Sequence, residues 1–250
     1  MIGIFDSGIG GLSVFREIKK ILPDEKYLYF SDNAHCPYGE KSKEYIIERA
    51  RWITGYMLDR GADIIVIACN TATAAAIRTL REEYSVPFIG MEPAIKPAAS
   101  VTRTGVVGVL ATAGTLKADK YKDTRGKYAE DIKVVERIGQ GFVELVEKGI
   151  THGPMAEGIV TASLEPLLRE GADTIVLGCT HYPFLSETIS SVTERLIPDR
   201  KVKLIDPAPA VAKHLYDIMK EKAIIKNDGF SIELSASGDS SLLLKMAQTI

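Results

Sequence analysis

The chain has 250 residues, which is long for one domain and comfortable for two. It carries 31 lysine and arginine residues against 33 aspartate and glutamate residues, so its net charge of −2 provides no basic excess for binding nucleic acid. The longest apolar runs, such as residues 64–69, are far short of the roughly 20 residues that cross a bilayer, which excludes a membrane-spanning segment.

The first residues and the cysteines indicate the compartment. The chain starts with a short apolar run that reaches Asp6 without a preceding basic segment, so we expect no export signal. Three cysteines are an odd count and include no Cys-x-x-Cys pair, which does not suit a disulfide framework. We therefore expect a cytoplasmic protein with reduced thiols.

Short β-branched apolar runs alternate with longer amphipathic segments along the whole chain. We predict strands over residues 1–5, 26–31, 63–68, 87–90, 105–110, 132–135, 174–178, 201–205 and 231–235. Apolar residues at helical spacing predict a helix over residues 42–60, and a second helix ends just before Gly171. Strands that alternate with helices form βαβ units, so the sequence predicts an α/β fold with mostly parallel sheets covered on both faces.

One segment of the chain occurs twice. Residues 61–69 align without gaps onto residues 171–179, with six of nine positions identical at an offset of 110. Residues 2–5 similarly resemble residues 107–110, and residues 92–94 resemble residues 206–208. Three matches in the same order indicate two similar, pseudo-symmetric α/β halves.

Polar residues follow the predicted strands. In open α/β sheets, ligands bind beyond the carboxyl ends of the strands, where these residues would gather. They are Asp6-Ser7-Gly8, Asp32-Asn33, Cys69-Asn70-Thr71, Glu92, Thr112 and Cys179-Thr180-His181. The repeat therefore places one cysteine at the same strand end in each half, and each cysteine precedes a predicted helix N-terminus, which favours thiolate.

Two thiols on opposite faces of one carbon suit a specific reaction. One thiolate can remove the α-proton of an amino acid while the other thiol delivers a proton to the opposite face, which inverts the configuration. Asp6 could assist Cys69, and His181 could assist Cys179. Backbone N–H groups of the Gly-rich segment after Asp6 could hold a carboxylate. No lysine stands in a context typical of a pyridoxal cofactor, and no fourth ligand accompanies Cys69, Cys179 and His181, so we expect no cofactor and no metal.

Several motifs in this sequence resemble those of glutamate racemases, within the aspartate/glutamate racemase family. They are Asp6-Ser7-Gly8-Ile9-Gly10-Gly11-Leu12-Ser13-Val14, Pro37-Tyr38-Gly39, Ala68-Cys69-Asn70-Thr71-Ala72-Thr73, Glu92-Pro93-Ala94-Ile95-Lys96-Pro97, Leu177-Gly178-Cys179-Thr180-His181-Tyr182-Pro183 and Ser237-Gly238-Asp239. The resemblance covers essentially the whole chain.

The resemblance implies a cofactor-independent isomerase that interconverts L- and D-glutamate and supplies D-glutamate for peptidoglycan. It also implies two α/β domains, residues 1–97 with 208–250 and residues 98–207, with the active site in the cleft between them. A homodimer is the expected assembly. Family members that are activated by a peptidoglycan precursor carry an N-terminal extension, which this sequence lacks. We therefore expect no activation by such a precursor.

The resemblance also implies the roles of individual residues. Cys69 and Cys179 would be the two proton donors and acceptors, assisted by Asp6 and His181. The residues expected to bind substrate are Asp6, Ser7, Tyr38, Gly39, Asn70, Thr71, Thr180 and His181. Glu147 matches an acidic residue near the second thiol, although a solvated helix face would explain it equally well. Cys36 stands where these relatives usually have an apolar or threonine residue, and we interpret it as incidental.

Other functions remain open at the level of sequence. An aspartate racemase or related isomerase would share the paired thiols. The depth of the site decides which substrate side chain fits, and residue spacing does not give this depth. An amino-acid-binding module could have two α/β halves but would not need matched cysteines. Cys69, Cys179 and His181 could also contribute to a metal site, for which no fourth ligand is evident, or the thiols could form a redox pair.

Overall fold

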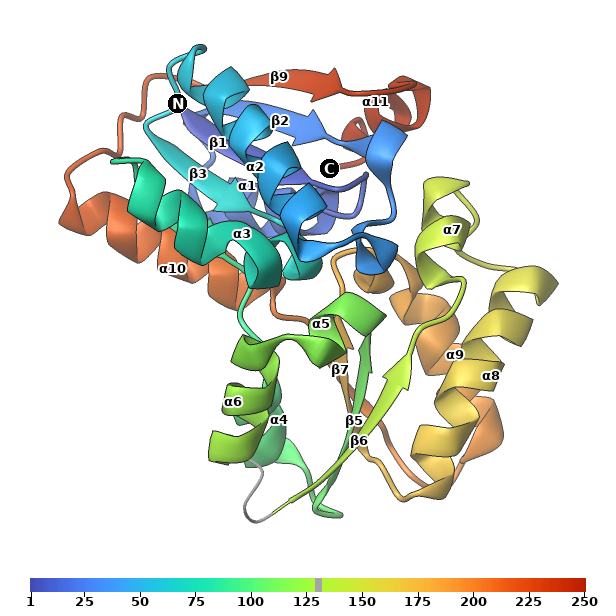
Figure 1. The fold of residues 1–250 in the computed structure, drawn as a ribbon. Coiled ribbons are helices and arrows are strands. Elements are labelled where there is room, and N and C mark those ends of the chain that lie inside the picture. The colour runs from blue at the N-terminus through green and yellow to red at the C-terminus, as the bar shows by residue number, and fades with distance from the viewer. Residues whose placement is uncertain (129–131) are drawn as a thin grey trace. The chain divides into compact units, whose positions relative to one another are not determined.

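The structure is a computed structural model that describes residues 1–128 and 132–250. The chain separates into two compact units: the first unit contains residues 1–92 and 208–250, and the second unit contains residues 93–207. Each unit contains one parallel sheet with helices packed against it (Figure 1). The predicted α/β class with two parallel sheets is confirmed. Among the described residues, no helix combines the length and apolarity that crossing a bilayer requires.

The first unit contains a five-stranded sheet in the order β4-β3-β1-β2-β9. Its strands are β1 (Ile2–Asp6), β2 (Lys26–Ser31), β3 (Ile64–Ile67), β4 (Phe88–Gly90) and β9 (Ser231–Ala236). Its helices are α1 (Leu12–Ile21), α2 (Lys43–Leu58), α3 (Asn70–Glu83), α10 (Ala208–Glu221) and α11 (Ser241–Ala247), with short 3₁₀ turns η1 (Asn33–His35) and η2 (Tyr38–Glu40). Helix α2 packs against α3, and α1 packs against α10.

The second unit contains a four-stranded sheet in the order β6-β5-β7-β8. Its strands are β5 (Val106–Ala111), β6 (Lys133–Ile138), β7 (Thr174–Gly178) and β8 (Lys203–Ile205). Its helices are α4 (Ile95–Val101), α5 (Ala113–Lys117), α6 (Asp119–Tyr128), α7 (Phe142–Glu147), α8 (Pro154–Arg169) and α9 (Ser186–Leu196), with the 3₁₀ turn η3 (Tyr182–Leu185) before α9.

The sequence repeat is also a repeat of topology. Strands β4-β3-β1-β2 of the first sheet correspond in order to β8-β7-β5-β6 of the second. The register is the same, because Gly3 lies opposite Ile65 in one sheet and Gly108 lies opposite Ile175 in the other. Both glycines allow a helix to pack closely on the strand: a Cβ would lie 2.8 Å from Met57 Sδ of α2 at position 3 and 3.1 Å from Leu167 Cδ1 of α8 at position 108. Strand β9 is the addition to the first sheet.

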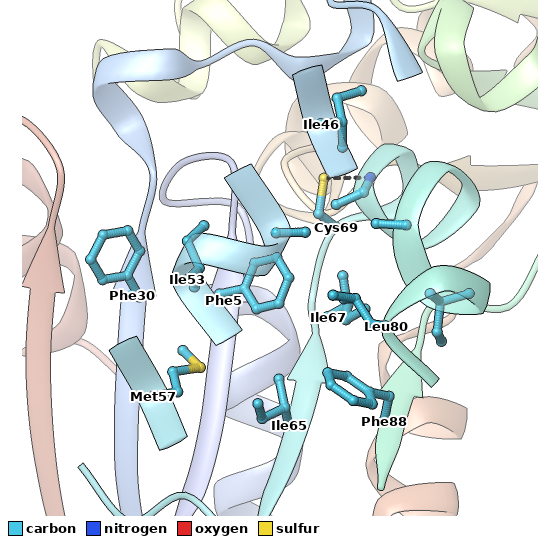
Figure 2. Packing of buried hydrophobic residues seen from close by; sticks show 14 of the residues in the cluster. Phe5, Phe30, Ile46, Ile53, Met57, Ile65, Ile67, Cys69, Leu80 and Phe88 are labelled. Carbon is cyan, nitrogen blue, oxygen red and sulfur yellow. Dashed lines mark hydrogen bonds between the residues drawn. The ribbon is translucent and has the colours of Figure 1, made fainter. Parts of the chain in front are cut away.

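A single apolar cluster fixes α2 and α3 against the first sheet. Ser42 caps α2 by accepting a hydrogen bond from the Tyr45 N–H. The side chains of Ile46, Ala50, Ile53 and Met57 are buried along one face of α2, as their spacing predicts. They pack with strand residues such as Ile65 and with the α3 residue Leu80 (Figure 2). This packing positions the carboxyl end of β3 and the start of α3.

The predicted strands are all present, with their ends shifted by up to three residues. Residues 26–31 and 174–178 coincide with β2 and β7. The largest extension is β6, which continues to Ile138 through Glu136 and Arg137 because it is an edge strand with partly exposed side chains. Gly171 has a φ of 97° just after α8, which is the conformation expected of a glycine that ends a helix.

The aspartate of each repeated segment anchors the start of the neighbouring strand. The Asp63 N–H donates to Met1 O, and the Asp173 N–H donates to the equivalent carbonyl of Val106. The Asp173 carboxylate also accepts hydrogen bonds from the N–H groups of Arg103 (2.7 Å) and Thr104 (3.1 Å). Burial alone would raise the pKa of Asp173, but the hydrogen bonds from Thr102, Arg103 and Thr104 outweigh it and hold the pKa below its usual value.

Replacing Asp173 by Asn is expected to lower the free energy of unfolding by about 1–3 kcal/mol at pH 7, because bonds to a charged acceptor are lost. A lowered pKa stabilises the folded state above the unfolded-state pKa of about 3.9, and this contribution disappears as the pH falls through the folded-state pKa. Urea denaturation of wild type and D173N should therefore converge below pH 4. Asp123, exposed on α6, supplies the control D123N. Equal stability of D173N and wild type at pH 7 would refute this role.

Candidate active site

The predicted site residues lie at the carboxyl ends of parallel strands in each unit. In the first unit, Asp6 ends β1, Ser7 follows it, and Cys69 lies between β3 and α3. Asn70 and Thr71 begin α3, whereas Tyr38 and Gly39 lie in η2, after β2. In the second unit, Cys179, Thr180 and His181 directly follow β7. The site residues therefore form two groups, one in each unit.

Cys69 is the N-terminal cap of α3. Its sulfur accepts a hydrogen bond from the Ala72 N–H at 3.4 Å, drawn as the dashed line in Figure 2. The same sulfur lies 3.7 Å from the Ser7 hydroxyl oxygen, and the residue is only 5% exposed. Backbone N–H groups at a helix N-terminus stabilise negative charge, so this position favours a thiolate.

The carboxylate of Asp6 is held by the backbone that follows it. It accepts hydrogen bonds from the N–H groups of Gly8 (3.3 Å) and Gly11 (2.9 Å), and the residue is fully buried. A Cβ at Gly11 would lie 2.7 Å from Asp6 Cβ and 2.8 Å from the Tyr29 hydroxyl, so only glycine fits there. The Gly-rich segment thus orients Asp6 beside Ser7, whose hydroxyl contacts the Cys69 sulfur.

A partly buried ion pair between Asp32 and Arg49 holds Tyr38 within the cluster that contains Cys69. The Tyr38 hydroxyl donates to Asp32, and Arg49 binds the same carboxylate with Nε (3.0 Å) and Nη2 (2.7 Å). Burial, followed by the negative charge of Asp32, raises the pKa of Tyr38 well above its usual value, and Cys69 contributes in the same direction. Tyr38 therefore remains a neutral hydrogen-bond donor.

Asp32 joins Tyr38 to Arg49, a connection that the sequence does not predict. Burial would raise its pKa, but hydrogen bonds from Arg49, Tyr38 and His35 outweigh this effect and lower the pKa below its usual value. The only sequence signal was its position directly after β2, and the partner Arg49 lies on α2 without a motif to mark it.

Asn70 offers a polar atom for a ligand. Its Oδ1 is buried and has no hydrogen-bond partner among the residues that the structure describes, and the residue is 8% exposed. Leaving a buried amide oxygen unbonded costs free energy. A bound ammonium group would supply the missing donor.

Cys179 is accompanied by a histidine and a carboxylate. Its sulfur lies 3.8 Å from Nδ1 of His181, and Nε2 of the same ring lies 2.6 Å from Oε1 of Glu147. Glu147 ends α7 and His181 is almost completely buried. If Nε2 donates to the carboxylate, Nδ1 is left as an acceptor that faces the thiol. The histidine can then take the thiol proton, while Glu147 stabilises the resulting imidazolium.

The segment after Cys179 differs from its prediction. The helix expected from Pro183 is the single 3₁₀ turn η3, in which the Tyr182 N–H donates to Cys179 O (3.1 Å), and α9 begins at Ser186. The fully buried Tyr182 ring fixes this turn by packing edge-on against Phe142, with centroids 4.9 Å apart. Among the described residues, the group beside the Cys179 sulfur is therefore the His181 imidazole rather than the N-terminus of an α-helix.

Cys36 lies between η1 and η2 and is partly exposed. All three cysteines are free thiols. Since Cys36 follows β2 rather than β3 or β7, it has no equivalent in the repeated segments.

The variant Glu147→Gln is expected to slow the alkylation of Cys179 by iodoacetamide about tenfold at neutral pH. A neutral amide can still accept from His181 but stabilises an imidazolium less than a carboxylate does, so the thiolate fraction falls. Peptide mass spectrometry follows Cys179 separately from Cys36 and Cys69. The control Glu187→Gln changes an exposed carboxylate at the start of α9. An unchanged alkylation rate of Cys179 in E147Q would exclude this role of Glu147 and His181.

These features define a class of α/β proteins with two related units, each with a free thiol at the same strand end. The model of the family described as Asp/Glu/Hydantoin racemase matches residues 2–215, and the chain belongs to this family. It is 50% identical over 225 residues to the glutamate racemase of Ectopseudomonas mendocina (strain ymp), covering 90% of this chain and 84% of that protein. The resemblance found in the sequence is therefore confirmed.

Solved structures agree with this assignment. The crystal structure of glutamate racemase isoform RacE1 from Bacillus anthracis has a TM-score of 0.87 at 32% identity, covering 100% of this chain and 92% of that chain. The glutamate racemase from Francisella tularensis subsp. tularensis SCHU S4 in complex with D-glutamate has a TM-score of 0.82 at 31% identity, covering 99% and 92%.

Proposed function

We propose that this protein is a cofactor-independent glutamate racemase, an isomerase that interconverts L- and D-glutamate. The observation that carries the proposal is the pair of free thiols, Cys69 and Cys179, at the same strand end of two repeated units. Family membership and relatives of about the same length, which are named glutamate racemases, support it.

The proposed mechanism uses the two thiols on opposite faces of the same α-carbon. For one enantiomer, the Cys69 thiolate removes the α-proton and Cys179 delivers a proton to the other face; for the second enantiomer the roles exchange. Each half-reaction exchanges one C–H bond for one S–H bond, so no net redox change occurs. General acid–base groups of this kind typically contribute about 10²–10⁴-fold each.

The surrounding side chains suit these two roles. Ser7 and the N-terminus of α3 support the Cys69 thiolate. We propose that Asp6, held by the N–H groups of Gly8 and Gly11, assists at this thiol. His181 with Glu147 can take up and return the proton of Cys179. We propose that Asp6, Ser7, Tyr38, Gly39, Asn70, Thr71, Thr180 and His181 bind the amino acid, with Asn70 Oδ1 accepting from its ammonium group.

Further properties belong to the same proposal. We propose that D-glutamate is supplied for peptidoglycan, that the protein acts in the cytoplasm, where its three thiols stay reduced, and that it forms a homodimer. We also propose that the functional domains are residues 1–97 with 208–250 and residues 98–207, close to the two compact units.

Separate Cys69→Ser and Cys179→Ser variants are expected to lose racemisation by at least about a hundredfold, because one face of the α-carbon loses its acid–base group. In D₂O with a chelator present, each variant should exchange the α-proton of only one enantiomer, and the two variants should differ in which one. Proton NMR of the α-position measures this directly. The control Cys36→Ser should retain activity, and full activity in C69S or C179S would overturn the mechanism.

Substrate choice is tested with the wild type. L-Glutamate should racemise in a polarimetric or chiral chromatographic assay, and L-aspartate should turn over at least about tenfold more slowly, since a site built for the longer side chain leaves the shorter one incompletely held. Preferential turnover of aspartate would favour the aspartate racemase alternative. Binding of glutamate without α-proton exchange would favour a binding module instead.

A further inference from the structure

The loop between β2 and α2 carries Tyr38 and Gly39, two of the residues proposed to bind substrate. Figure 1 shows β9, which comes near the end of the chain, beside β2. Because β9 is parallel to β2, the turn after β9 and the loop after β2 both start at the carboxyl ends of the strands, on the same side of the sheet. These two segments are about two hundred residues apart in the sequence but adjacent in the fold.

Asn33 bonds to the turn after β9 with both ends of its side chain. Its Nδ2 donates to Asp239 O, and its Oδ1 accepts from the Gly238 N–H at 2.8 Å. A Cβ at Gly238 would lie 3.0 Å from Asn33 Oδ1, so a larger residue would push this contact apart. The amide of Asn33 therefore pairs with the backbone of the turn much as a neighbouring strand would.

Ser237 makes the second connection to the loop. Its backbone N–H continues the β2–β9 pairing by donating to Ser31 O at 2.9 Å. Its hydroxyl oxygen accepts from the Ala34 N–H at 3.1 Å. Asn33 and Ala34 directly follow Asp32, whose carboxylate accepts the Tyr38 hydroxyl, so the turn holds the part of the loop that carries the partner of Tyr38.

We propose that Asn33 and the turn Ser237–Asp239 form a clasp that positions the Tyr38 loop for substrate binding at the Cys69 side of the site. The proposal rests on the proposed racemase function and deepens it. Asn33 and Ser237 are positioning residues, because they act through Asp32 and Tyr38. The clasp gives residues 237–239 a role at a site built mainly by residues 1–92.

The first test is physical and independent of activity. Ser237→Ala and Asn33→Ala should accelerate amide hydrogen exchange of residues 34–41 by about tenfold, while exchange in β1, β3 and the second unit stays unchanged. Ser237→Thr, which keeps the hydroxyl, should restore slow exchange. The control Ser240→Ala removes a hydroxyl from the same region that makes no capping hydrogen bond to α11. Wild-type exchange of residues 34–41 in both S237A and N33A would overturn the clasp.

The second test separates positioning from loss of folded protein. Both alanine variants should lower kcat/KM for glutamate about tenfold, mainly by lowering kcat, because a small displacement of a binding group misaligns the α-carbon with the Cys69 sulfur. With α-deuterated substrates, the isotope effect on kcat/KM should rise for one enantiomer and fall for the other, because only the proton transfer at Cys69 is slowed. A smaller active fraction would leave both isotope effects unchanged.

The two tests distinguish the clasp from the enzymatic function. If wild type racemises glutamate and the variants match it in kcat/KM and in both isotope effects, the positioning role is wrong and the proposed function stands. If wild type fails to racemise glutamate while S237A and N33A still release residues 34–41, the proposed function is wrong and the clasp remains as a structural connection. Loss of activity with unchanged isotope effects would also count against positioning.

Discussion

The parallel pairing of the strands is the constraint on which the candidate site depends. Every strand pair found among the described residues is parallel, so successive strands of a sheet all end at the same edge and the chain must return through helices. The residues that follow β1, β2, β3 and β9 therefore meet at one edge of the first sheet. Ser7, Tyr38, Cys69 and Ser237 come from these four exits. Without parallel pairing they would be distributed over two edges.

Equivalent thiols in the two units are supported by different chemistry. Cys69 is stabilised by a backbone N–H of α3 and lies near a hydroxyl, and neither group changes its charge near neutral pH. Cys179 instead lies beside an imidazole that is bonded to a carboxylate, and histidine is the side chain that gains or loses a proton in this range. The two units thus share the position of the thiol but differ in the groups that lie beside it.

Much of the fold could be predicted from local sequence. The aromatic-rich run at 26–31 and the β-branched run at 174–178 predicted β2 and β7 without error, and the repeated segments predicted the equivalent sheet topologies. These features are local, because periodicity and turn residues act over a few positions. The 3₁₀ turn after Cys179 was not predicted, since Pro183 fits the first turn of either kind of helix and the packing of Tyr182 decides between them.

The sequence marks candidate site residues where they directly follow a strand, and it gives no signal for contacts that depend on pairing between distant residues. Cys69, Cys179 and His181 are marked by their positions at strand ends, and Cys69 caps α3 as expected. Arg49 carries no such mark, because its role exists only once α2 brings it to Asp32, 17 residues away. The bonds between Asn33 and residues 238–239 span more than two hundred positions and have no local signal in a single sequence.

The repeat also reveals a shared rule for the groups beside each thiol. Strands β2 and β6 are equivalent, and the segment after each supplies a carboxylate to an aromatic side chain: Asp32 binds Tyr38 in the first unit, and Glu147 binds His181 in the second. A phenol bonded to a buried carboxylate keeps its proton, whereas an imidazole in the same arrangement can exchange one. Strand β9 covers the outer edge of β2, and the equivalent edge strand β6 is partly exposed. The first unit therefore combines a phenol that keeps its proton with an additional strand, β9, whose following turn is hydrogen-bonded to the loop that carries this phenol. Fixed geometry of this kind is what precise positioning requires.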